Sequence, residues 1–166
     1  LVQQGKHAEA IPYLQAAIRQ TSRNGASVES RSPLGAEALK RLAAEARNNL
    51  GVALVSQGKV DNGIRCYREA IRLLPDYALA HYNWGNALAE QGKTEEALEH
   101  YRAALQAKAV PAQLHFRMGL ALARTGKTAE AISQYRSALE IQPDYLQAHK
   151  RLGIALADKG DIREAL

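Results

Sequence analysis

Apolar residues recur along the chain at the three- and four-residue spacing of helices, and each helical pattern stops at a glycine or a proline. Residues 84–105 hold two such segments. The turn between them falls at Gly92, because glycine readily ends a helix in the left-handed conformation. Thr94 is expected to cap the second helix, with Glu95 and Glu96 in its positive first turn. The pattern therefore predicts pairs of helices joined by tight turns.

This pattern returns with a step of 34 residues. Two columns of glycine share the step: Gly51, Gly85, Gly119 and Gly153, and Gly58, Gly92, Gly126 and Gly160. Columns of alanine, leucine and tyrosine follow it as well: Ala53, Ala87, Ala121 and Ala155; Leu54, Leu88, Leu122 and Leu156; Tyr67, Tyr101 and Tyr135. Pro75 and Pro143 end the second helices, since proline cannot continue a helix. A fixed period of this length indicates an array of stacked repeats.

Two of the turns end in Gly-Lys-Thr, as a Walker A phosphate-binding loop does. A Walker A loop also needs a glycine five residues before the second one, because the backbone must curl around the phosphates. Ala87 and Ala121 stand at those places, and no strand pattern precedes either turn. We therefore expect helix-ending turns and no cofactor.

The columns resemble the tetratricopeptide repeat, a 34-residue motif of eight small and large positions. The unit over residues 78–111 shows the match as His81, Trp84, Gly85, Leu88, Ala97, Tyr101 and Ala104. Gly63 replaces the usual alanine, and Pro111 comes two residues late, so we expect a longer exit after residues 106–110. Small residues such as Gly119 and Ala131 are expected to let paired helices approach closely. The resemblance implies an all-α superhelical solenoid of antiparallel helix pairs.

The period is broken once, because the turn glycines Gly5 and Gly58 are 53 residues apart, 19 more than the repeat. Residues 21–35 are rich in Ser, Gly and Asn and are expected to form a surface loop, with Ser32 capping a helix that starts at Pro33. One long helix over about 33–57 should follow. The loop is either a solvated insertion or a segment that folds over the array to bind or occlude a partner.

These observations predict a single array over 1–166. Its parts are a partial repeat at 1–21, an insertion with loop and helix extension at 22–43, full repeats at 44–77, 78–111 and 112–145, and a partial repeat at 146–166. The chain starts at Leu1 without methionine and stops at Leu166 within an expected helix, so we expect it to belong to a longer protein. Uncovered apolar faces at the two ends would then allow self-association.

Composition limits the function classes. One cysteine, Cys66, forbids an internal disulfide and is expected to pack as a small hydrophobe. No segment has the ~18 apolar residues of a membrane span, so we expect a cytoplasmic segment without membrane contact. His81, His115 and His149 share one column, but helices packed about 8–10 Å apart cannot bring three such rings within about 2.1 Å of one zinc ion. We expect no metal, no catalytic residue and no enzyme activity.

The formal charge is +5, from 22 basic and 17 acidic side chains. The basic residues of the second helices, such as Arg68 and Arg102, alternate with acidic ones, such as Glu69 and Glu99, which is typical of a solvated face. We therefore expect no nucleic acid partner. A protein or peptide partner fits better.

The resemblance implies a concave face lined by the first helix of each unit. The candidate peptide-binding residues by column are Asn48, Asn49, Tyr82, Asn83, Asn86, Phe116, Arg117, Arg124, Lys150 and Arg151. Amides can bond an extended backbone, the two aromatic rings offer apolar contacts, and the cations favour Asp, Glu or a free C-terminus.

Two subclasses of the family share parts of this set. Asn86 and Arg117 resemble the chaperone-binding type, while Asn49 and Asn83 resemble the asparagine column of protein O-GlcNAc transferases. We predict a protein–protein interaction scaffold that binds an extended acidic segment. The alternative is a substrate-presenting arm of a larger enzyme such as a glycosyltransferase.

Overall fold

The structure, a computed structural model, describes residues 2–28, 33–107 and 111–160, and every regular element in these ranges is an α-helix. The chain divides into two compact units, Leu1–Ala87 and Leu88–Leu166. The first unit contains α1 (Val2–Val28), α2 (Pro33–Ser56), α3 (Val60–Leu73) and the first part of α4 (Ala78–Glu90). The second contains the end of α4 with α5 (Thr94–Ala104), α6 (Ala112–Arg124), α7 (Thr128–Ile141) and α8 (Leu146–Lys159).

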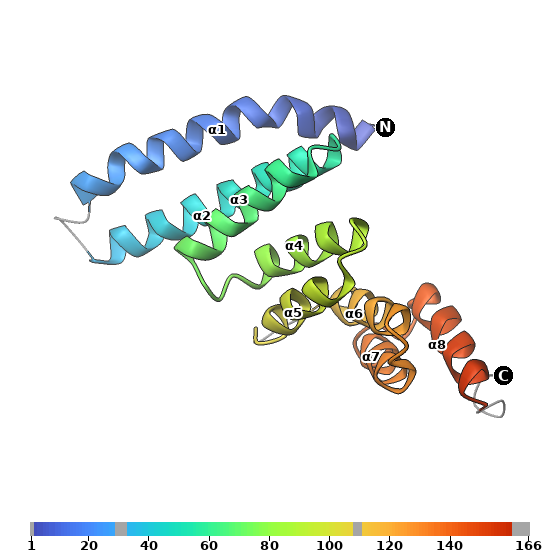
Figure 1. The fold of residues 1–166 in the computed structure, drawn as a ribbon. Coiled ribbons are helices and arrows are strands. Elements are labelled where there is room, and N and C mark those ends of the chain that lie inside the picture. The colour runs from blue at the N-terminus through green and yellow to red at the C-terminus, as the bar shows by residue number, and fades with distance from the viewer. Residues whose placement is uncertain (1, 29–32, 108–110, 161–166) are drawn as a thin grey trace. The chain divides into compact units, whose positions relative to one another are not determined.

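In the first unit, α2 packs against both α1 and α3, and Figure 1 shows these three helices side by side. Ala44, Ala70 and Ala80, one from each of α2, α3 and α4, are 0% exposed. Ile71 and Tyr77 are among the larger side chains that pack against them. Alanines at the centre allow the helix backbones to approach closely, as expected for paired helices.

In the second unit, α6 packs against α5 and α7, and α7 also contacts α8. Its largest side chains with at most 2% exposure come from all these helices: Leu98, Tyr101, Leu114, Leu122, Tyr135 and Leu156. Burial of each stabilises the fold by roughly 1.5–3 kcal/mol. The buried set follows the repeat columns, so each repeat supplies the same positions to a local core.

The four turn glycines that end first helices have the left-handed conformation that the sequence predicts. Gly58, Gly92, Gly126 and Gly160 have φ angles of 78°, 80°, 77° and 88°. The next residue closes the turn, as where the Lys127 N–H donates to the Leu122 carbonyl oxygen at 2.9 Å. The Gly-Lys-Thr segments at Gly92 and Gly126 therefore end α4 and α6 and begin α5 and α7.

The predicted close approach at Gly119 is made by the Tyr135 ring of α7. A Cβ atom added to Gly119 would lie 2.5 Å from Cε1 of that ring, a distance that real Cβ atoms do not show. The same relation holds in the first unit, where a Cβ on Gly51 would lie 2.5 Å from Cε1 of Tyr67. Glycine at positions 51 and 119 is therefore required by side-chain packing, and the backbone there is an ordinary helix.

The predicted prolines and the shifted Pro111 have the expected effects. Helix α3 ends at Leu73 and α7 at Ile141, two residues before Pro75 and Pro143. Helix α5 has 11 residues, whereas α3 and α7 have 14, so the exit before Pro111 is longer, as predicted. Residues 108–110 of this exit lie outside the described residues.

The predicted loop over residues 21–35 is wrong for residues 21–28, which continue α1 without a break. The expected turn at Gly5 is also wrong, since α1 already begins at Val2. Ser, Asn and Gly normally favour turns, but Thr21 Oγ1 and Ser22 Oγ both donate to the Ile18 carbonyl oxygen at 2.9 Å. Packing of α1 on α2 then maintains a helix of 27 residues.

The long helix expected over about 33–57 is confirmed as α2, Pro33–Ser56. The inserted residues therefore lengthen both helices of the α1–α2 hairpin, and the expected cap Ser32 lies outside the described residues.

The cap predicted at Thr94 is wrong, because Lys93 occupies the cap position and Thr94 is the first helical residue. The hydroxyl of Thr94 is 3.4 Å from the Gly92 carbonyl oxygen and bonds no helical N–H.

Candidate functional site

The amide side chains predicted for the binding face of the first unit form a connected row. Asn83 Nδ2 of α4 donates to Asn48 Oδ1 of α2 at 2.9 Å, and Asn48 Nδ2 donates to Asn49 Oδ1 at 3.2 Å. Asn48 is only 1% exposed, whereas Asn49 is exposed. Asn48 is thus a buried polar group with partners on two helices, and a peptide could reach Asn49 but not Asn48.

The remaining candidates in the first unit lie on α4. Tyr82, Asn83 and Asn86 are each half-buried, and Leu79 is 49% exposed on the same helix. This part of α4 offers amides and an apolar side chain but no charge. It is suited to hydrogen bonding with a peptide backbone and has no group that selects acidic residues.

Phe116 in the second unit is 8% exposed and belongs to the core. Its ring centroid lies 6.0 Å from that of Tyr135 and 5.0 Å from that of Tyr145, both with tilted planes. Such aromatic contacts add about 0.5–1.5 kcal/mol beyond area burial. Phe116 therefore cannot offer the predicted apolar contact at the surface, whereas Ile154 on α8 is 45% exposed.

The predicted cations of the second unit separate into two kinds. Arg124 Nη1 donates to the Ala89 carbonyl oxygen at 3.1 Å, near the end of α4, where a cation meets the negative pole of the helix. Arg117, Lys150 and Arg151 are exposed, and among the described residues none of the three forms an ion pair. These three side chains have no carboxylate partner within the part of the chain that the structure describes.

The charge of Arg151 acts on a buried group beneath this surface. Burial raises the pKa of Tyr135, and the positive charge of Arg151 lowers it by a smaller amount. Arg117 and Arg151 occupy equivalent positions, one repeat apart, on α6 and α8.

Lys127 of the second Gly-Lys-Thr segment pairs with a carboxylate of the protein itself. Lys127 Nζ lies 3.6 Å from Glu95 Oε2, which joins the start of α7 to the start of α5. Both side chains are exposed enough for the pair to contribute only about 0–1 kcal/mol. The repeat period hides this contact, because it joins side chains at different positions in neighbouring repeats.

The histidine column contacts polar groups of the protein itself. His81 and His149 bond the carbonyl oxygens of Pro75 and Pro143, and His115 bonds Gln134. In the described part of the chain, no three His, Cys, Asp or Glu side chains are placed to hold a metal ion. The rings of His81 and His149 connect a turn to the helix that follows it, and the ring of His115 connects α6 to its paired helix α7.

Cys66 is half-buried on α3, and burial is the main cause that raises the pKa of its thiol. A raised pKa keeps the thiol protonated at neutral pH, as suits a packed side chain.

No helix among the described residues is long and apolar enough to cross a membrane.

The structure has the features of a helical repeat protein. Its helices form pairs joined by glycine turns, a tyrosine packs on a helix glycine, and the first helices carry polar residues on their exposed faces. The chain belongs to the tetratricopeptide repeat family. The family described as "Tetratricopeptide repeat" matches residues 1–62 and 48–113, and one described as "TPR repeat" matches residues 119–160.

Solved structures with the same fold are similar to this chain. YrrB, whose structure is described as that of "a TPR protein with an unusual peptide-binding site", has 24% identity over 74% of this chain and 63% of its own, with a TM-score of 0.70. A crystal structure of MamA has 23% identity over 79% and 81% of the two chains, also at 0.70. MamA from Desulfovibrio magneticus RS-1 has 20% identity over 92% and 88%, at 0.68.

These structures confirm the predicted fold class, an all-α solenoid of antiparallel helix pairs. The chain spans 63% of the YrrB chain that it matches. In the comparison with curated proteins, nothing matches.

Proposed function

We propose that this chain is a protein–protein interaction scaffold, and that its second unit binds an extended acidic segment of a partner through Arg117, Lys150 and Arg151. The observation that carries the proposal is that these exposed cations have no carboxylate partner among the described residues. Lys127 and Arg124 of the same unit, in contrast, bond groups of the protein itself. Arg117, Lys150 and Arg151, which all lie on first helices, are therefore available to an external carboxylate.

The chemistry of the two arginines fits this partner. Guanidinium groups bind carboxylates through two parallel hydrogen bonds, which gives both direction and strength. Arg117 and Arg151 repeat one position on successive first helices, so an extended segment could meet both with separate Asp or Glu residues. Ile154, three residues after Arg151 on α8 and 45% exposed, adds an apolar contact beside Arg151.

The amide side chains of the first unit offer peptide contacts of their own, which do not select for charge. Asn49 and Asn83 belong to the amide row of α2 and α4, and amides can donate to and accept from the backbone of an extended peptide. The YrrB structure, which has the same fold, is described as having a peptide-binding site. That description supports a peptide as the class of partner and does not say which residues bind it.

The alternative role, a substrate-presenting arm of a larger enzyme, would use the asparagine column as its main feature. The column contains Asn49 and Asn83 and then changes to Arg117 and Arg151. We place the scaffold role first because half of the column carries positive charge.

A peptide-array screen at low and high salt tests the proposal. The wild type should retain acidic peptides, and Arg117→Glu/Arg151→Glu should lose them. Arg102→Glu/Arg136→Glu, which makes the same change of charge on the second helices α5 and α7, is the control and should bind as the wild type does. Equal binding of acidic and basic peptides by the wild type, or unchanged binding by the first variant, would contradict the proposal.

A further inference from the structure

The inserted part of the α1–α2 hairpin contains a cavity of about 180 Å³ in the first unit. Three helices line it: α1 through Thr21 and Ser22, α2 through Ala36, Leu39 and Lys40, and α3 through Leu73. Most of these residues lie in or beside the inserted segment, which the other repeats lack. The cavity is therefore a property of this hairpin and not of the repeat in general.

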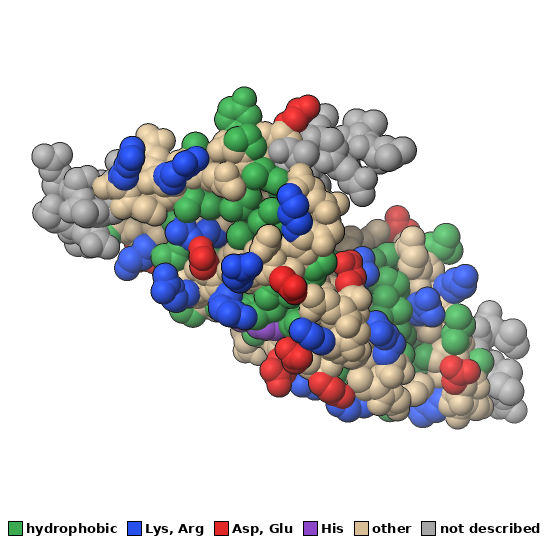
Figure 2. Space-filling model, turned by 45° about the horizontal axis from the view of Figure 1, so that its top comes forward, with side chains coloured by type: hydrophobic (Ala, Val, Ile, Leu, Met, Phe, Trp, Pro, Cys, Tyr) green, Lys and Arg blue, Asp and Glu red, His purple; other side chains and the backbone are tan. Residues whose placement is uncertain are grey.

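The lining has an apolar floor and a basic edge. Ala36, Leu39 and Leu73 provide apolar surface, and the charged side chains that line the cavity, Lys40 and Arg47, are both basic. In Figure 2, basic side chains border a strip of hydrophobic side chains on the visible face of this unit. Of these two cations, Lys40 is the one that can attract an anionic group to the entrance, because Arg47 is already paired with Glu69.

The two cations differ in how they are held. Arg47 Nε lies 3.0 Å from Glu69 Oε2 and its Nη1 bonds the Ala43 carbonyl oxygen, so Arg47 is fixed in the wall. Lys40 Nζ lies 4.0 Å from Glu37 Oε2, at the limit of an ion pair, and the two side chains are 50% and 63% exposed. Lys40 is thus free to turn toward a carboxylate that arrives from outside.

The two hydroxyl groups of the lining use their protons within α1, which leaves their oxygen atoms able to accept hydrogen bonds. Thr21 Oγ1 and Ser22 Oγ both donate to the Ile18 carbonyl oxygen at 2.9 Å. Each hydroxyl oxygen keeps lone pairs that can accept a hydrogen bond from a peptide N–H. An acidic peptide can use both groups, since its carboxylate meets Lys40 while its backbone donates to the hydroxyls.

The size of the cavity limits what can enter it. An enclosed apolar cavity of about 150 Å³ holds one benzene-sized group, so this one, which is open to solvent on one side, has room for a single Phe or Leu side chain. A long acyl chain would remain mostly outside. We infer that the α1–α2 hairpin is a second interaction site, which takes one apolar side chain of an acidic partner peptide into this cavity and a flanking carboxylate onto Lys40.

This site is separate from the one proposed on α6 and α8, and the experiment is designed to distinguish them. The probe is fluorescein-labelled Asp-Glu-Phe-Glu-Asp, and the protein carries Arg117→Glu/Arg151→Glu to remove the other site. Fluorescence anisotropy should still report saturable binding in this background. Loss of all binding there would overturn the second site and leave the first proposal standing.

Two variants test the cavity in the same background. Ala36→Leu fills the cavity with a residue that helices accept well and should weaken binding by about tenfold or more, since the peptide can no longer bury its ring. Lys40→Glu reverses the charge at the entrance and should weaken binding by about fivefold. Replacing Phe by Ala in the peptide should have the same effect as filling the cavity.

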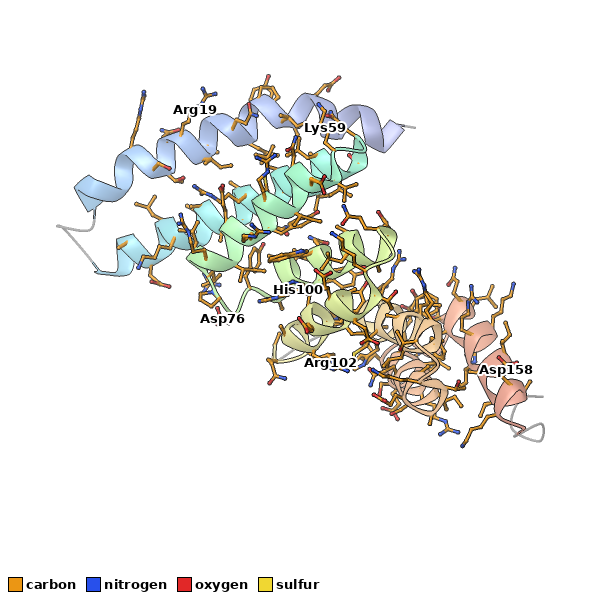
Figure 3. All side chains as sticks on the ribbon, in the orientation of Figure 1. Arg19, Lys59, Asp76, His100, Arg102 and Asp158 are labelled. Carbon is orange, nitrogen blue, oxygen red and sulfur yellow. The ribbon has the colours of Figure 1, made fainter. Side chains whose placement is uncertain are left out.

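Two control variants make the same charge reversal away from the cavity. Figure 3 shows Arg19 on the side of α1 that faces away from α2, and Lys59 in the turn that follows α2. Arg19→Glu and Lys59→Glu should leave the affinity unchanged. If they weaken binding as much as Lys40→Glu does, the peptide is attracted only by overall charge and the inference fails.

A nuclear magnetic resonance measurement on the wild type tests the site without relying on variants that could misfold. The methyl resonances of Leu39 and Leu73 should shift when the peptide is added, and those of Leu146 on α8 should not shift with the same midpoint. Unchanged Leu39 and Leu73 resonances at saturation would overturn the inference. So would equal affinity for the Ala-substituted peptide, or binding of dodecanoate at this cavity without binding of the peptide.

Discussion

The Nε2 atom of His149 lies 2.8 Å from the carbonyl oxygen of Pro143, six residues earlier in the chain. His81 makes the same bond to Pro75, at 3.1 Å. Because a carbonyl oxygen only accepts, each ring donates from Nε2. The bond fastens the turn that ends one repeat to the first helix of the next, which explains a histidine column without a metal.

The third histidine of the column, His115, does not bond a proline carbonyl oxygen. In its repeat the proline is shifted to Pro111, and His115 Nδ1 instead donates to Gln134 Oε1 at 2.9 Å. The ring turns from the preceding loop to α7. Histidine and proline therefore act as a pair in this array, and the pair is absent where the exit is longer.

Removing this bond should destabilise the second unit. We expect His149→Ala to lower the free energy of unfolding by about 0.5–1.5 kcal/mol, the usual worth of one hydrogen bond. Urea unfolding followed by circular dichroism measures it. Gln147→Ala, an exposed change on the same helix, should cost less than the histidine variant, and equal losses would show that the His149 bond adds nothing.

The turn glycine Gly126 should be sensitive to any side chain that resists its conformation. Its φ of 77° costs an L-residue about 1–2 kcal/mol, and more when the side chain is β-branched. We expect Gly126→Val to reduce stability and Gly126→Asn to be tolerated better, since Asn enters this region more easily. An added Cβ meets no atom within 4 Å, so a loss would come from the backbone alone.

The same variants separate a turn from a nucleotide site. We expect no saturable ATP binding by the wild type or by Lys127→Ala, measured by calorimetry. ATP binding that disappears in Lys127→Ala would show that the Gly-Lys-Thr segment has a role beyond ending α6.

The sequence predicted the parts of this molecule that depend on period and backbone chemistry. A column of glycines was enough to place four left-handed turns, because other residues rarely adopt that conformation. The composition of residues 21–28 predicted a loop, and this prediction was wrong. Side chains that favour turns can also bond a carbonyl oxygen of the preceding helical turn, as Thr21 does with Ile18. Packing against α2 decided between the two outcomes, and packing is not visible in composition.

The candidate site was harder to predict because one residue separates a buried from an exposed position. Asn48 and Phe116 share a repeat position and are both buried, while Asn49 and Arg117, each one residue later, are exposed. The residues that cover the buried pair, Asn83 over Asn48 and Tyr145 over Phe116, come from the following repeat or its leading turn. A column assigns a helix face only approximately, and the neighbouring helix decides which side chains remain accessible.

The effect of the Arg151 charge on the pKa of Tyr135 gives a prediction about pH. Burial raises the pKa of Tyr135 above its ordinary value of 10.0, and Arg151 opposes this rise. A group whose pKa is raised by folding contributes stability at pH values below its unfolded pKa, and loses it as pH rises through the folded value. The free energy of unfolding should therefore fall as pH increases above about 10.

Removing the charge should strengthen this effect. In Arg151→Ala the pKa of Tyr135 should rise further, because the cause that lowers it is gone while burial remains. Ultraviolet absorbance of the tyrosinate during a pH titration measures the change, with Tyr135→Phe identifying the signal. An unchanged titration in Arg151→Ala would place the guanidinium away from the Tyr135 ring and weaken the case for this face as an arginine site.

The helical state of the inserted segment can be tested with proline at Ser22. Residue 22 lies in the interior of α1, where proline removes a backbone hydrogen bond and clashes with the preceding turn, at a cost of about 3 kcal/mol or more. In a surface loop the same change would be nearly neutral. We expect Ser22→Pro to lower both the helical circular dichroism signal and the melting temperature of the chain. The matched control is Leu146→Pro at the first position of α8, where proline is well accepted and the leucine is 75% exposed. A Ser22→Pro protein as helical and as stable as this control would restore the loop that composition predicts, and with it would remove the cavity on which the second interaction site depends.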